Sequence, residues 1–282
     1  MAARFSNATV LVTGGSSGIG LATARAFAQE GAHVVLVARN KEKLEKARNE
    51  VQAHALSDSQ KIVAIPCDVS DADSVERAAR EAESRCGPID ILVNCAGIFL
   101  PEEFLTHSPE LFRKHVEIDL FGVVNMTRAV APSMVARGRG SIVNVSSMAG
   151  FIGVYGYTAY SAAKFGLMGF SEALRSELKP HGVTVSVVCP PDVDTPGLAA
   201  EKEVRPPETE KIAGTVKAWP PEAVARVILA AASSRKFLHI PGATNAFLFR
   251  LKGIFPELFY WVFDRQIASV RNERARTHKA ET

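Results

Sequence analysis

Thr13-Gly-Gly-Ser-Ser-Gly-Ile-Gly20 lies between an apolar run that starts at Ala8 and a helix-like run that ends at Gln29. The apolar run is typical of a buried parallel strand, and Gly31 provides a stop signal after the helix. A strand, a glycine-rich turn and a helix in this order predict the first unit of a dinucleotide-binding α/β fold.

The glycines of this turn allow the backbone to bend sharply and to approach a pyrophosphate closely. The helix that follows supplies free N–H groups and the positive end of its dipole. Two serines add hydroxyl donors. We therefore expect the turn to bind the cofactor through Gly14, Ser16, Ser17, Gly18, Ile19 and Gly20.

Strand-like and helix-like runs continue to alternate along the chain. Further strands are expected at residues 33–38, 61–67, 89–95, 141–146, 183–189 and 237–240. Helices are expected at residues 41–53, 73–85, 109–137, 158–179 and 220–233. Strands joined by crossover helices form a parallel sheet that is covered on both faces. The sequence thus predicts one doubly wound, seven-stranded α/β domain over residues 5–245 and an appended segment over residues 246–282.

The composition argues against several classes of protein. A net charge of +3 over 282 residues is too small to indicate nucleic-acid binding. The four cysteines show neither a C-x-x-C pair nor the spacing of a metal site, so no metal is expected, and reduced thiols in the cytoplasm are the simplest interpretation. Residues 1–7 lack the apolar core of a signal peptide, and no run of ~20 uncharged apolar residues indicates a spanning helix.

The end of the second expected strand indicates which nicotinamide cofactor fits. A carboxylate at this point binds the ribose 2′-hydroxyl of NAD. The chain instead has Arg39, whose planar guanidinium suits the 2′-phosphate of NADP, and Lys43 lies one helical turn further on. A solvated surface arginine is the alternative, because residues 41–46 are mostly charged. We expect NADPH/NADP⁺ as the cofactor.

Two further strand ends are expected to complete the cofactor site. Asp68 and Val69 follow the third strand, where they are placed to meet the adenine. Asn94, Ala96 and Gly97 follow the fourth strand, where small residues allow the ribose to pass.

Tyr160 and Lys164 stand four residues apart on an expected helix, so they share one face. A tyrosine titrates near pH ~10, and an ammonium beside it favours the phenolate, which lowers the pKa towards the range useful for acid–base catalysis. Ser147 ends the fifth strand, where its hydroxyl could hydrogen-bond a substrate oxygen that Tyr160 protonates. An ordinary amphipathic helix is the alternative interpretation of the Tyr160 and Lys164 pair alone.

Four motifs together resemble the short-chain dehydrogenases/reductases over residues 8 to about 195. They are T-G-x-x-x-G-I-G at residues 13–20, D-V at 68–69, N-x-A-G at 94–97, and a serine thirteen residues before Y-x-x-x-K at 160–164. The resemblance implies a Rossmann sheet ordered 3-2-1-4-5-6-7 and hydride transfer between the nicotinamide and a carbon that bears oxygen. It also implies that Tyr160 donates the proton in reduction. Lys164 would lower the pKa of Tyr160 and hold the nicotinamide ribose, and Ser147 would position the carbonyl oxygen.

The chain departs from the usual family pattern at two places. After the sixth strand the family usually reads P-G-x-x-x-T, whereas this chain reads P-P-D-V-D-T over residues 190–195; by the resemblance, Pro190, Val193 and Thr195 contact the cofactor. The helix before the fifth strand usually carries an asparagine that anchors a proton-relay water. Asp119 occupies that position, and a carboxylate accepts hydrogen bonds but cannot donate them as an amide does.

The first departure narrows the resemblance. P-P-D-x-D-T-P-G, together with V-A-R-N at residues 37–40, is similar to the branch of the family that reduces a long-chain 2-amino-3-ketone, 3-ketodihydrosphingosine, with NADPH in sphingolipid synthesis. We therefore expect an NADPH-dependent reductase of a lipid-like ketone. The alternatives are the same chemistry on another hydrophobic ketone, such as a steroid or retinoid, and a catalytically silent NADP-binding scaffold. The intact Ser147, Tyr160 and Lys164 argue against the scaffold.

One segment is expected to close over the substrate. Residues 195–218 are rich in Pro, Glu and Lys, and the equivalent segment of the family closes over the substrate. We expect a mobile lid there, with a disordered surface loop as the alternative.

The helices at residues 109–137 and 158–179 carry more apolar surface than one sheet face needs, and family members commonly pair through them. A homodimer or homotetramer is therefore expected.

The appended segment combines aromatic residues with positive charge. Residues 235–282 hold nine Lys/Arg and four Asp/Glu, a local charge of +5 against −2 for the remainder. On a helix, one apolar stripe is formed by Phe259, Phe263, Ile267 and Val270, widened by Leu258 and Val262. Basic residues at positions 250, 252, 265, 271, 274 and 276 accompany it. This pattern predicts peripheral membrane contact through residues 246–276 on the cytoplasmic face, with packing against the core or a second subunit as the alternative.

Overall fold

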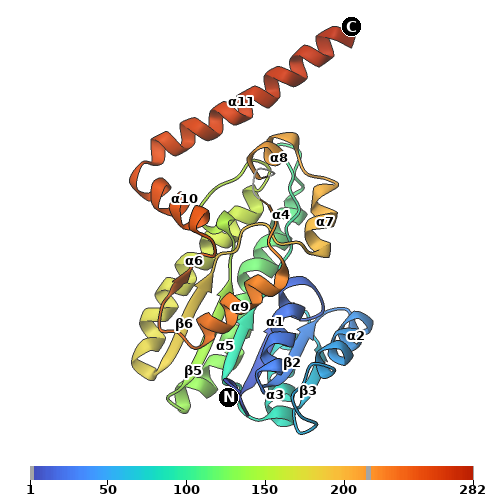
Figure 1. Cartoon of the computed structure of the whole chain (residues 1–282), viewed down its shortest axis with the longest axis vertical. Coiled ribbons are helices and arrows are strands. Elements are labelled where there is room, and N and C mark those ends of the chain that lie inside the picture. The colour runs from blue at the N-terminus through green and yellow to red at the C-terminus, as the bar shows by residue number, and fades with distance from the viewer. Residues whose placement is uncertain (1–2, 214–216, 282) are drawn as a thin grey trace.

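The computed structural model describes residues 3–213 and 217–281, with side chains described up to residue 273. Seven parallel strands form one sheet in the order β3-β2-β1-β4-β5-β6-β7, which confirms the predicted Rossmann topology (Figure 1). The strands are β1 (Thr9–Thr13), β2 (His33–Ala38), β3 (Ile62–Pro66), β4 (Ile91–Asn94), β5 (Gly140–Val145), β6 (Val183–Val188) and β7 (Leu238–His239).

Helices connect these strands and cover both faces of the sheet. They are α1 (Gly18–Gln29), α2 (Lys41–Gln52), α3 (Ala72–Cys86), α4 (Pro109–Val116), α5 (Gly122–Ala136), α6 (Thr158–Leu178) and α9 (Pro221–Ala232). Helices α1, α2 and α9 pack on one face, and α3, α5 and α6 pack on the other. Because both faces are buried, the central strands are apolar along their whole length rather than alternating.

The expected helix at residues 109–137 is interrupted. A π-helical segment, η1 (Glu117–Phe121), separates α4 from α5 and carries the buried Asp119. Single π turns inside helices are frequent at functional sites, because the extra residue turns a side chain to a new direction. The sequence pattern did not reveal this break, since η1 continues the same apolar face.

The predicted lid and the appended segment form helices at one end of the molecule, whereas the N-terminus lies at the other (Figure 1). They are α7 (Pro196–Lys202), α8 (Pro207–Ala213), α10 (Ala243–Ile254) and α11 (Pro256–Glu281). The predicted lid is therefore helical over its described part, rather than an irregular loop. Residues 214–216 of that lid and the side chains of Arg274 and Arg276 lie outside the described residues.

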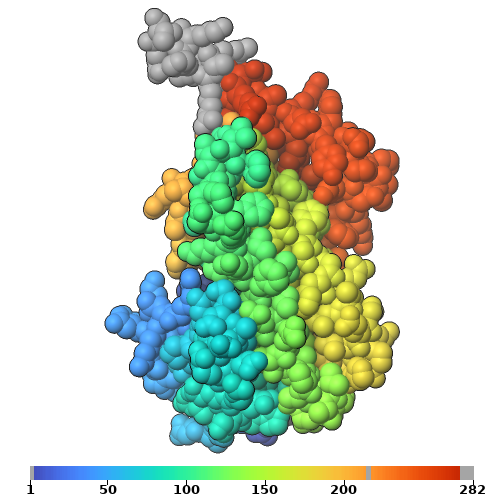
Figure 2. All heavy atoms as spheres, turned by 180° about the vertical axis from the view of Figure 1, so that it is seen from behind, coloured from blue at the N-terminus to red at the C-terminus, as the bar shows by residue number. Residues whose placement is uncertain are grey.

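The appended segment packs partly on the domain. A third apolar cluster joins Phe259 and Phe263 of α11 and Leu248 of α10 to Phe151 and Ile152. The Lys252 ammonium also donates a hydrogen bond to the Phe151 carbonyl. Figure 2 shows α10 and α11, in red, standing on the domain at this end. The C-terminal helices are thus fixed to the domain near β6 and β7.

The predicted stripe of α11 is divided between two environments. Phe259 and Val270 are buried, as the alternative of packing on the core requires. Leu258 and Val262, expected to widen the stripe, are exposed instead. Within residues 3–213 and 217–281, no helix combines the length and the apolar character needed to cross a bilayer.

Candidate active site

The glycine turn after β1 has the geometry of an anion-binding turn. Gly14 and Gly18 have positive φ angles of 68° and 52°, which other residues rarely adopt. A Cβ atom on Gly20 would lie only 2.3 Å from the Gly14 carbonyl oxygen, so α1 can approach the turn only with glycine there. The free N–H groups at the start of α1 therefore face the space above the turn.

A cavity of about 340 Å³ opens at this turn. Most of the predicted cofactor residues line it: Gly14, Ser16, Ser17, Gly18, Ile19, Gly20, Arg39, Asp68, Val69, Ala96, Gly97 and Thr195. They come from the carboxyl ends of β1 to β4 and from the start of α7, and ligands of open α/β sheets bind outside these strand ends. A glycine-walled cradle with a helix N-terminus on one side and Arg39 on another fits a dinucleotide.

Six predicted cofactor residues do not line this cavity: Tyr160, Lys164, Pro190 and Val193 are described below, and the other two are Lys43 and Asn94. Lys43 is exposed on α2, and its backbone N–H donates to the Asn40 side chain that caps the helix. Asn94 is buried behind the strand ends, where its amide donates to the Asn144 side chain at 2.9 Å. The position of Asn94 gives it a supporting role for β4 and β5 rather than a direct contact.

Other cavity-lining residues were not predicted from the sequence. They are Val37, Ala38, Asn40, Cys67, Cys95, Ile98, Phe99, Ile118 and Gly197. Most are direct neighbours of predicted residues at the same strand ends, so the strand boundaries were the available signal. Phe99 is different, because it lines this cavity and a second one, and its ring centre lies 6.2 Å from that of Tyr160.

The second cavity, of about 220 Å³, contains Ser147 and Tyr160. Ser147 begins the 3-10 segment η2 (Met148–Gly150), and its hydroxyl accepts a hydrogen bond from the Ala149 N–H at 3.1 Å. Tyr160 lies in the first turn of α6, among the rings of Phe99, His115 and Tyr157. Pro190 and Val193, predicted to contact the cofactor, line this second cavity instead.

Lys164 lies on the face of α6 that carries Tyr160, as the i, i+4 spacing predicts. Its ammonium is 5.5 Å from the centre of the Tyr160 ring, is almost completely buried, and donates to the Val145 carbonyl at 3.3 Å. It also forms a 3.4 Å ion pair with Asp119. The structure therefore brings the three predicted catalytic side chains and the residue at the unusual position 119 into one cluster.

Asp119 is held in place by its neighbours. Its Oδ1 atom accepts a hydrogen bond from the Ile98 N–H at 3.2 Å, besides pairing with Lys164. A Cβ atom on Gly97 would stand 2.4 Å from this same oxygen, so glycine at 97 is needed for the contact. Burial raises the pKa of the Asp119 carboxyl to about 6, although Lys164 and the Ile98 N–H act in the opposite direction.

The pKa of Tyr160 differs in direction from the sequence-based expectation. Burial raises it, and the Asp119 charge adds to that effect. Lys164 lowers the pKa, as predicted, and a hydrogen bond with Ser147 does the same, but burial outweighs both. Tyr160 therefore keeps its proton at neutral pH, the form that a proton donor requires.

The lining of the second cavity is mainly apolar and comes from distant parts of the chain. Its apolar members are Ile19, Phe99, Met148, Ala149, Ile152, Val154, Pro190, Pro191, Val193, Leu198, Ile212, Ala213, Leu248 and Phe263. Leu198 belongs to α7, and Leu248 and Phe263 belong to the C-terminal helices. The lid and the appended segment thus form walls of the cavity that contains Tyr160.

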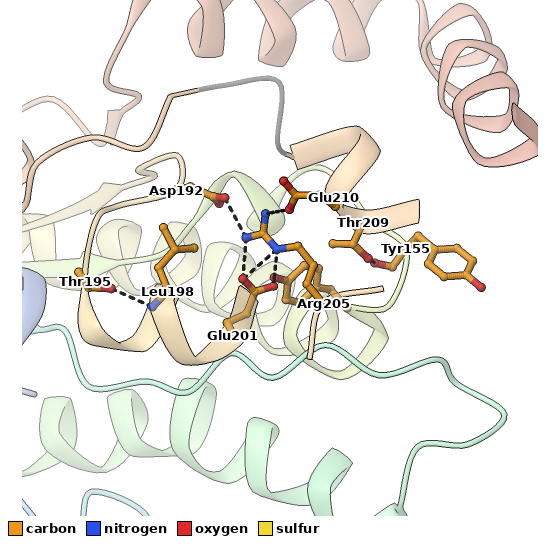
Figure 3. Close-up of polar contacts among 9 residues, drawn as sticks. Tyr155, Asp192, Thr195, Leu198, Glu201, Arg205, Thr209 and Glu210 are labelled. Atoms are coloured by element: carbon orange, nitrogen blue, oxygen red, sulfur yellow. Dashed lines mark hydrogen bonds and ion pairs between the residues drawn. The ribbon is translucent and has the colours of Figure 1, made fainter. Parts of the chain in front are cut away.

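A buried ion-pair network joins the two lid helices to the cavity wall (Figure 3). The Arg205 guanidinium lies between three carboxylates: it donates to both oxygens of Glu201, at 2.6 to 2.9 Å, to Asp192 at 3.0 Å and to Glu210 at 2.9 Å. The Tyr157 hydroxyl donates to Glu201 as well. Since Asp192 precedes α7 and Glu210 lies on α8, this network holds both ends of the lid.

The sequence profile of the short chain dehydrogenases matches residues 8–205. The chain belongs to the short-chain dehydrogenase family. The members of this family are oxidoreductases that use a nicotinamide cofactor, in agreement with the glycine-walled cavity beside Tyr160.

Two family members and one solved structure are particularly similar. A 3-ketodihydrosphingosine reductase of Bos taurus is 45% identical over 79% of this chain and 67% of its own length. A 3-dehydrosphinganine reductase of Danio rerio is 44% identical over 80% of this chain and 68% of its own. The chain thus spans about two thirds of the length of these relatives. The crystal structure of an actinorhodin polyketide ketoreductase variant with NADPH has 33% identity and a TM-score of 0.76, covering 86% of this chain and 97% of that one.

Proposed function

We propose that this protein reduces the ketone of 3-ketodihydrosphingosine with NADPH, giving dihydrosphingosine in sphingolipid synthesis. The observation that carries the proposal is the apolar cavity at Ser147 and Tyr160, in a chain 45% identical to a reductase named for that substrate. A long alkyl chain requires apolar walls, and a ketone requires a hydrogen-bond donor at their inner end. The cavity supplies both.

The residues of the cluster have distinct roles in this proposal. When bound, NADPH supplies a hydride to the carbonyl carbon. Ser147 donates a hydrogen bond to the carbonyl oxygen, and Tyr160 transfers its proton to that oxygen as negative charge develops on it. Lys164 stabilises the resulting phenolate, since its ammonium lies 5.5 Å from the ring centre. Asp119 holds the Lys164 ammonium in place through their ion pair.

Arg39 supports NADPH as the cofactor in preference to NADH. It lines the cofactor cavity at the end of β2, where an acidic residue would bind the ribose hydroxyls of NADH. Its guanidinium offers a planar set of N–H donors to a 2′-phosphate.

An assay of the purified protein tests the proposed reaction. We expect NADPH absorbance to fall when 3-ketodihydrosphingosine is added, and mass spectrometry to detect dihydrosphingosine. A steroid ketone and a retinal serve as comparison substrates. Faster turnover of either comparison substrate than of the long-chain amino ketone would contradict the proposal.

Peripheral membrane contact is a second part of the proposal. The exposed side of the α10–α11 corner carries Phe255, Leu258, Trp261 and Val262, and the Arg265 guanidinium lies 4.1 Å from the centre of the Trp261 ring. Aromatic and aliphatic side chains flanked by basic residues are typical of interfacial helices. Because Leu248 and Phe263 of the same helices line the substrate cavity, a substrate could pass from lipid to Tyr160 along this segment. We place this contact on the cytoplasmic face, where the four free cysteines would stay reduced.

We also propose that residues 5–245 form the catalytic domain, that residues 246–282 contact the membrane, and that the protein pairs through the helical segments at residues 109–137 and 158–179. Phe121 and Phe165 are large apolar side chains that these segments leave half exposed. Burial of such side chains between two copies is a common basis of homo-oligomers. Light scattering at micromolar concentration should give at least the mass of a dimer, and a monomeric mass would contradict this part.

A further inference from the structure

The substrate cavity contains one charged side chain among the described residues that line it. That side chain is Asp192, which follows β6 and faces the cavity together with Pro190 and Pro191. The other polar side chains of the lining are the hydroxyls and amide of Ser146, Ser147, Tyr157, Tyr160, Thr195 and Asn245. An anionic group in a mainly apolar cavity is costly unless a cation balances it, so its presence calls for an explanation.

Backbone contacts fix the position of Asp192. The Trp219 N–H donates to the Asp192 carbonyl at 2.9 Å, and the Asp194 N–H donates back to the Trp219 carbonyl at 2.8 Å. Two prolines precede Asp192 and restrict the backbone further. The carboxylate is therefore presented to the cavity from a rigid support.

The charge of Arg205 is shared among more carboxylates than it can neutralise. Glu201 is fully buried and receives the two-pronged contact, while Glu210 is largely exposed to solvent. Asp192 is bonded to Arg205 through its Oδ2 atom only, and 35% of its side chain is exposed. Within the described part of the chain, no donor is bonded to its Oδ1 atom. The Asp192 Oδ1 atom is therefore free to accept a hydrogen bond from a cation in the cavity. Arg205, which holds Oδ2, is already paired with Glu201.

The position of Asp192 relative to Tyr160 is informative as well. Asp192 and Tyr160 line the same cavity, of about 220 Å³, and the Asp192 charge helps to raise the pKa of Tyr160. A cation bound at Asp192 would consequently lie near the carbon that is reduced. In a 2-amino-3-ketone the ammonium is attached to the carbon next to the carbonyl, so such a substrate presents both groups to the same cavity.

We propose that Asp192 is the specificity residue that binds the protonated amine of the substrate and thereby selects 2-amino-3-ketones over simple ketones. This inference rests on the proposed function, because it names the group that recognises that substrate. Asp192 accepts a charge-assisted hydrogen bond from the ammonium through Oδ1 while Arg205 holds Oδ2. The apolar walls then receive the alkyl chain.

The test compares two substrates and two variants. One substrate is 3-ketodihydrosphingosine, and the other is 1-hydroxyoctadecan-3-one, which has the same chain without the amine. The isosteric variant Asp192→Asn keeps an acceptor for Arg205 but removes the charge. Glu210→Gln is the matched control, because Glu210 contacts Arg205 at a similar distance, 2.9 Å against 3.0 Å, but does not line the cavity.

We expect Asp192→Asn to lower kcat/KM for the amino ketone about 10- to 100-fold, the size of one charge-assisted hydrogen bond, mainly through KM. The amine-free ketone should change less than about threefold with this variant. Glu210→Gln should leave the ratio of the two substrates unaltered. An unchanged ratio of the two substrates would overturn the proposal, whether kcat/KM falls equally for both, as an effect through the lid alone would give, or falls for neither.

A binding measurement separates this inference from the proposed reaction. Calorimetry with 2-aminooctane-1,3-diol and octane-1,3-diol, short analogues of the product with and without the amine, requires no turnover. The wild-type protein should prefer the amine, and Asp192→Asn should lose that preference. If turnover of 3-ketodihydrosphingosine is absent while this preference is present, the proposed reaction fails and the amine site stands. Equal binding of the two diols by the wild type would overturn the amine site, even if the ketone is reduced.

Discussion

The cofactor cavity and the substrate cavity share Ile19, Phe99 and Thr195 in their walls but are built in different ways. The first is formed by strand ends and a glycine turn, most of them between residues 14 and 118. The second is formed by side chains from η2, α6, α7, α8, α10 and α11. Backbone and small residues determine what binds in the first, whereas the side chains of segments late in the sequence determine what binds in the second. The same cofactor chemistry can therefore serve a different ketone when only the second set changes.

The largest effect is expected on kcat when Tyr160 is replaced, and it should leave cofactor binding intact. Tyr160→Phe removes the proton donor and leaves the ring among Phe99, His115 and Tyr157. We expect kcat to fall about 10²- to 10⁴-fold, the usual contribution of a general acid. Single-turnover and steady-state assays with the ketone measure this loss.

The cofactor cavity should be unaffected by the same substitution. Fluorescence titration should give an NADPH Kd within about threefold of wild type, because Tyr160 lines only the substrate cavity. Near-normal turnover would refute the role of Tyr160. A large loss of NADPH affinity would mean that the two cavities are less independent than their lining suggests.

The next effect concerns the surface of α11 that we propose contacts lipid. Leu258 and Trp261 are each 51% exposed on α11, and placing both in a bilayer would stabilise binding by roughly 1.5–3 kcal/mol per side chain. The double variant Leu258→Glu/Trp261→Glu should weaken sedimentation with anionic vesicles on the order of 100-fold. High salt alone should release only part of the wild-type protein, because the apolar share is not screened.

An exposed leucine far from α11 provides the matched control for the vesicle experiment. Leu56 is 61% exposed in the loop after α2, far in sequence from α11. Leu56→Glu should leave vesicle binding unaltered. Equal loss with both variants would show that general surface hydrophobicity, rather than the C-terminal segment, attracts the vesicles.

A smaller effect is expected on the cofactor preference when Arg39 in the cofactor cavity is replaced. Arg39→Asp replaces the guanidinium with the acidic group that binds the ribose hydroxyls of NADH. The preference for NADPH over NADH, measured as the ratio of kcat/KM values, should fall about 10- to 100-fold. Lys43→Asp is the control, because Lys43 does not line the cavity and should change the ratio little. A wild-type protein that uses both cofactors equally would contradict the role of Arg39.

The cofactor cavity and the substrate cavity also differ in how far they can be predicted from the sequence. The glycine turn, the strand ends and the Tyr160–Lys164 pair are local patterns with fixed spacing, so the fold and most cofactor residues could be predicted. Lys43, expected to add a second charge, does not line the cavity, because helix periodicity does not say where an exposed side chain ends. The Arg205 network and the walls at Leu248 and Phe263 join segments far apart in the sequence. No spacing rule relates such segments, so only the folded structure reveals them.

The smallest expected effect lies at the junction of the two cavities. Asp119→Asn restores the residue that the family usually has and removes a buried negative charge. In the wild type that charge raises the pKa of Tyr160 and also raises the pKa of Lys164. Its removal should lower both values, and ketone reduction needs Tyr160 protonated and Lys164 charged. The alkaline decline of kcat/KM should therefore begin at a lower pH in the variant.

The acidic side of the pH profile of kcat/KM is the internal control for this prediction. Burial raises the pKa of Asp119 to about 6, so below that pH the wild-type side chain is also neutral. The two profiles should then converge below about pH 6 and separate above it. A decline that moves to higher pH in the variant would mean that loss of the ion pair acts chiefly by displacing Lys164. Profiles that differ most below pH 6 would show that the shape of the amide, rather than its lack of charge, matters at position 119.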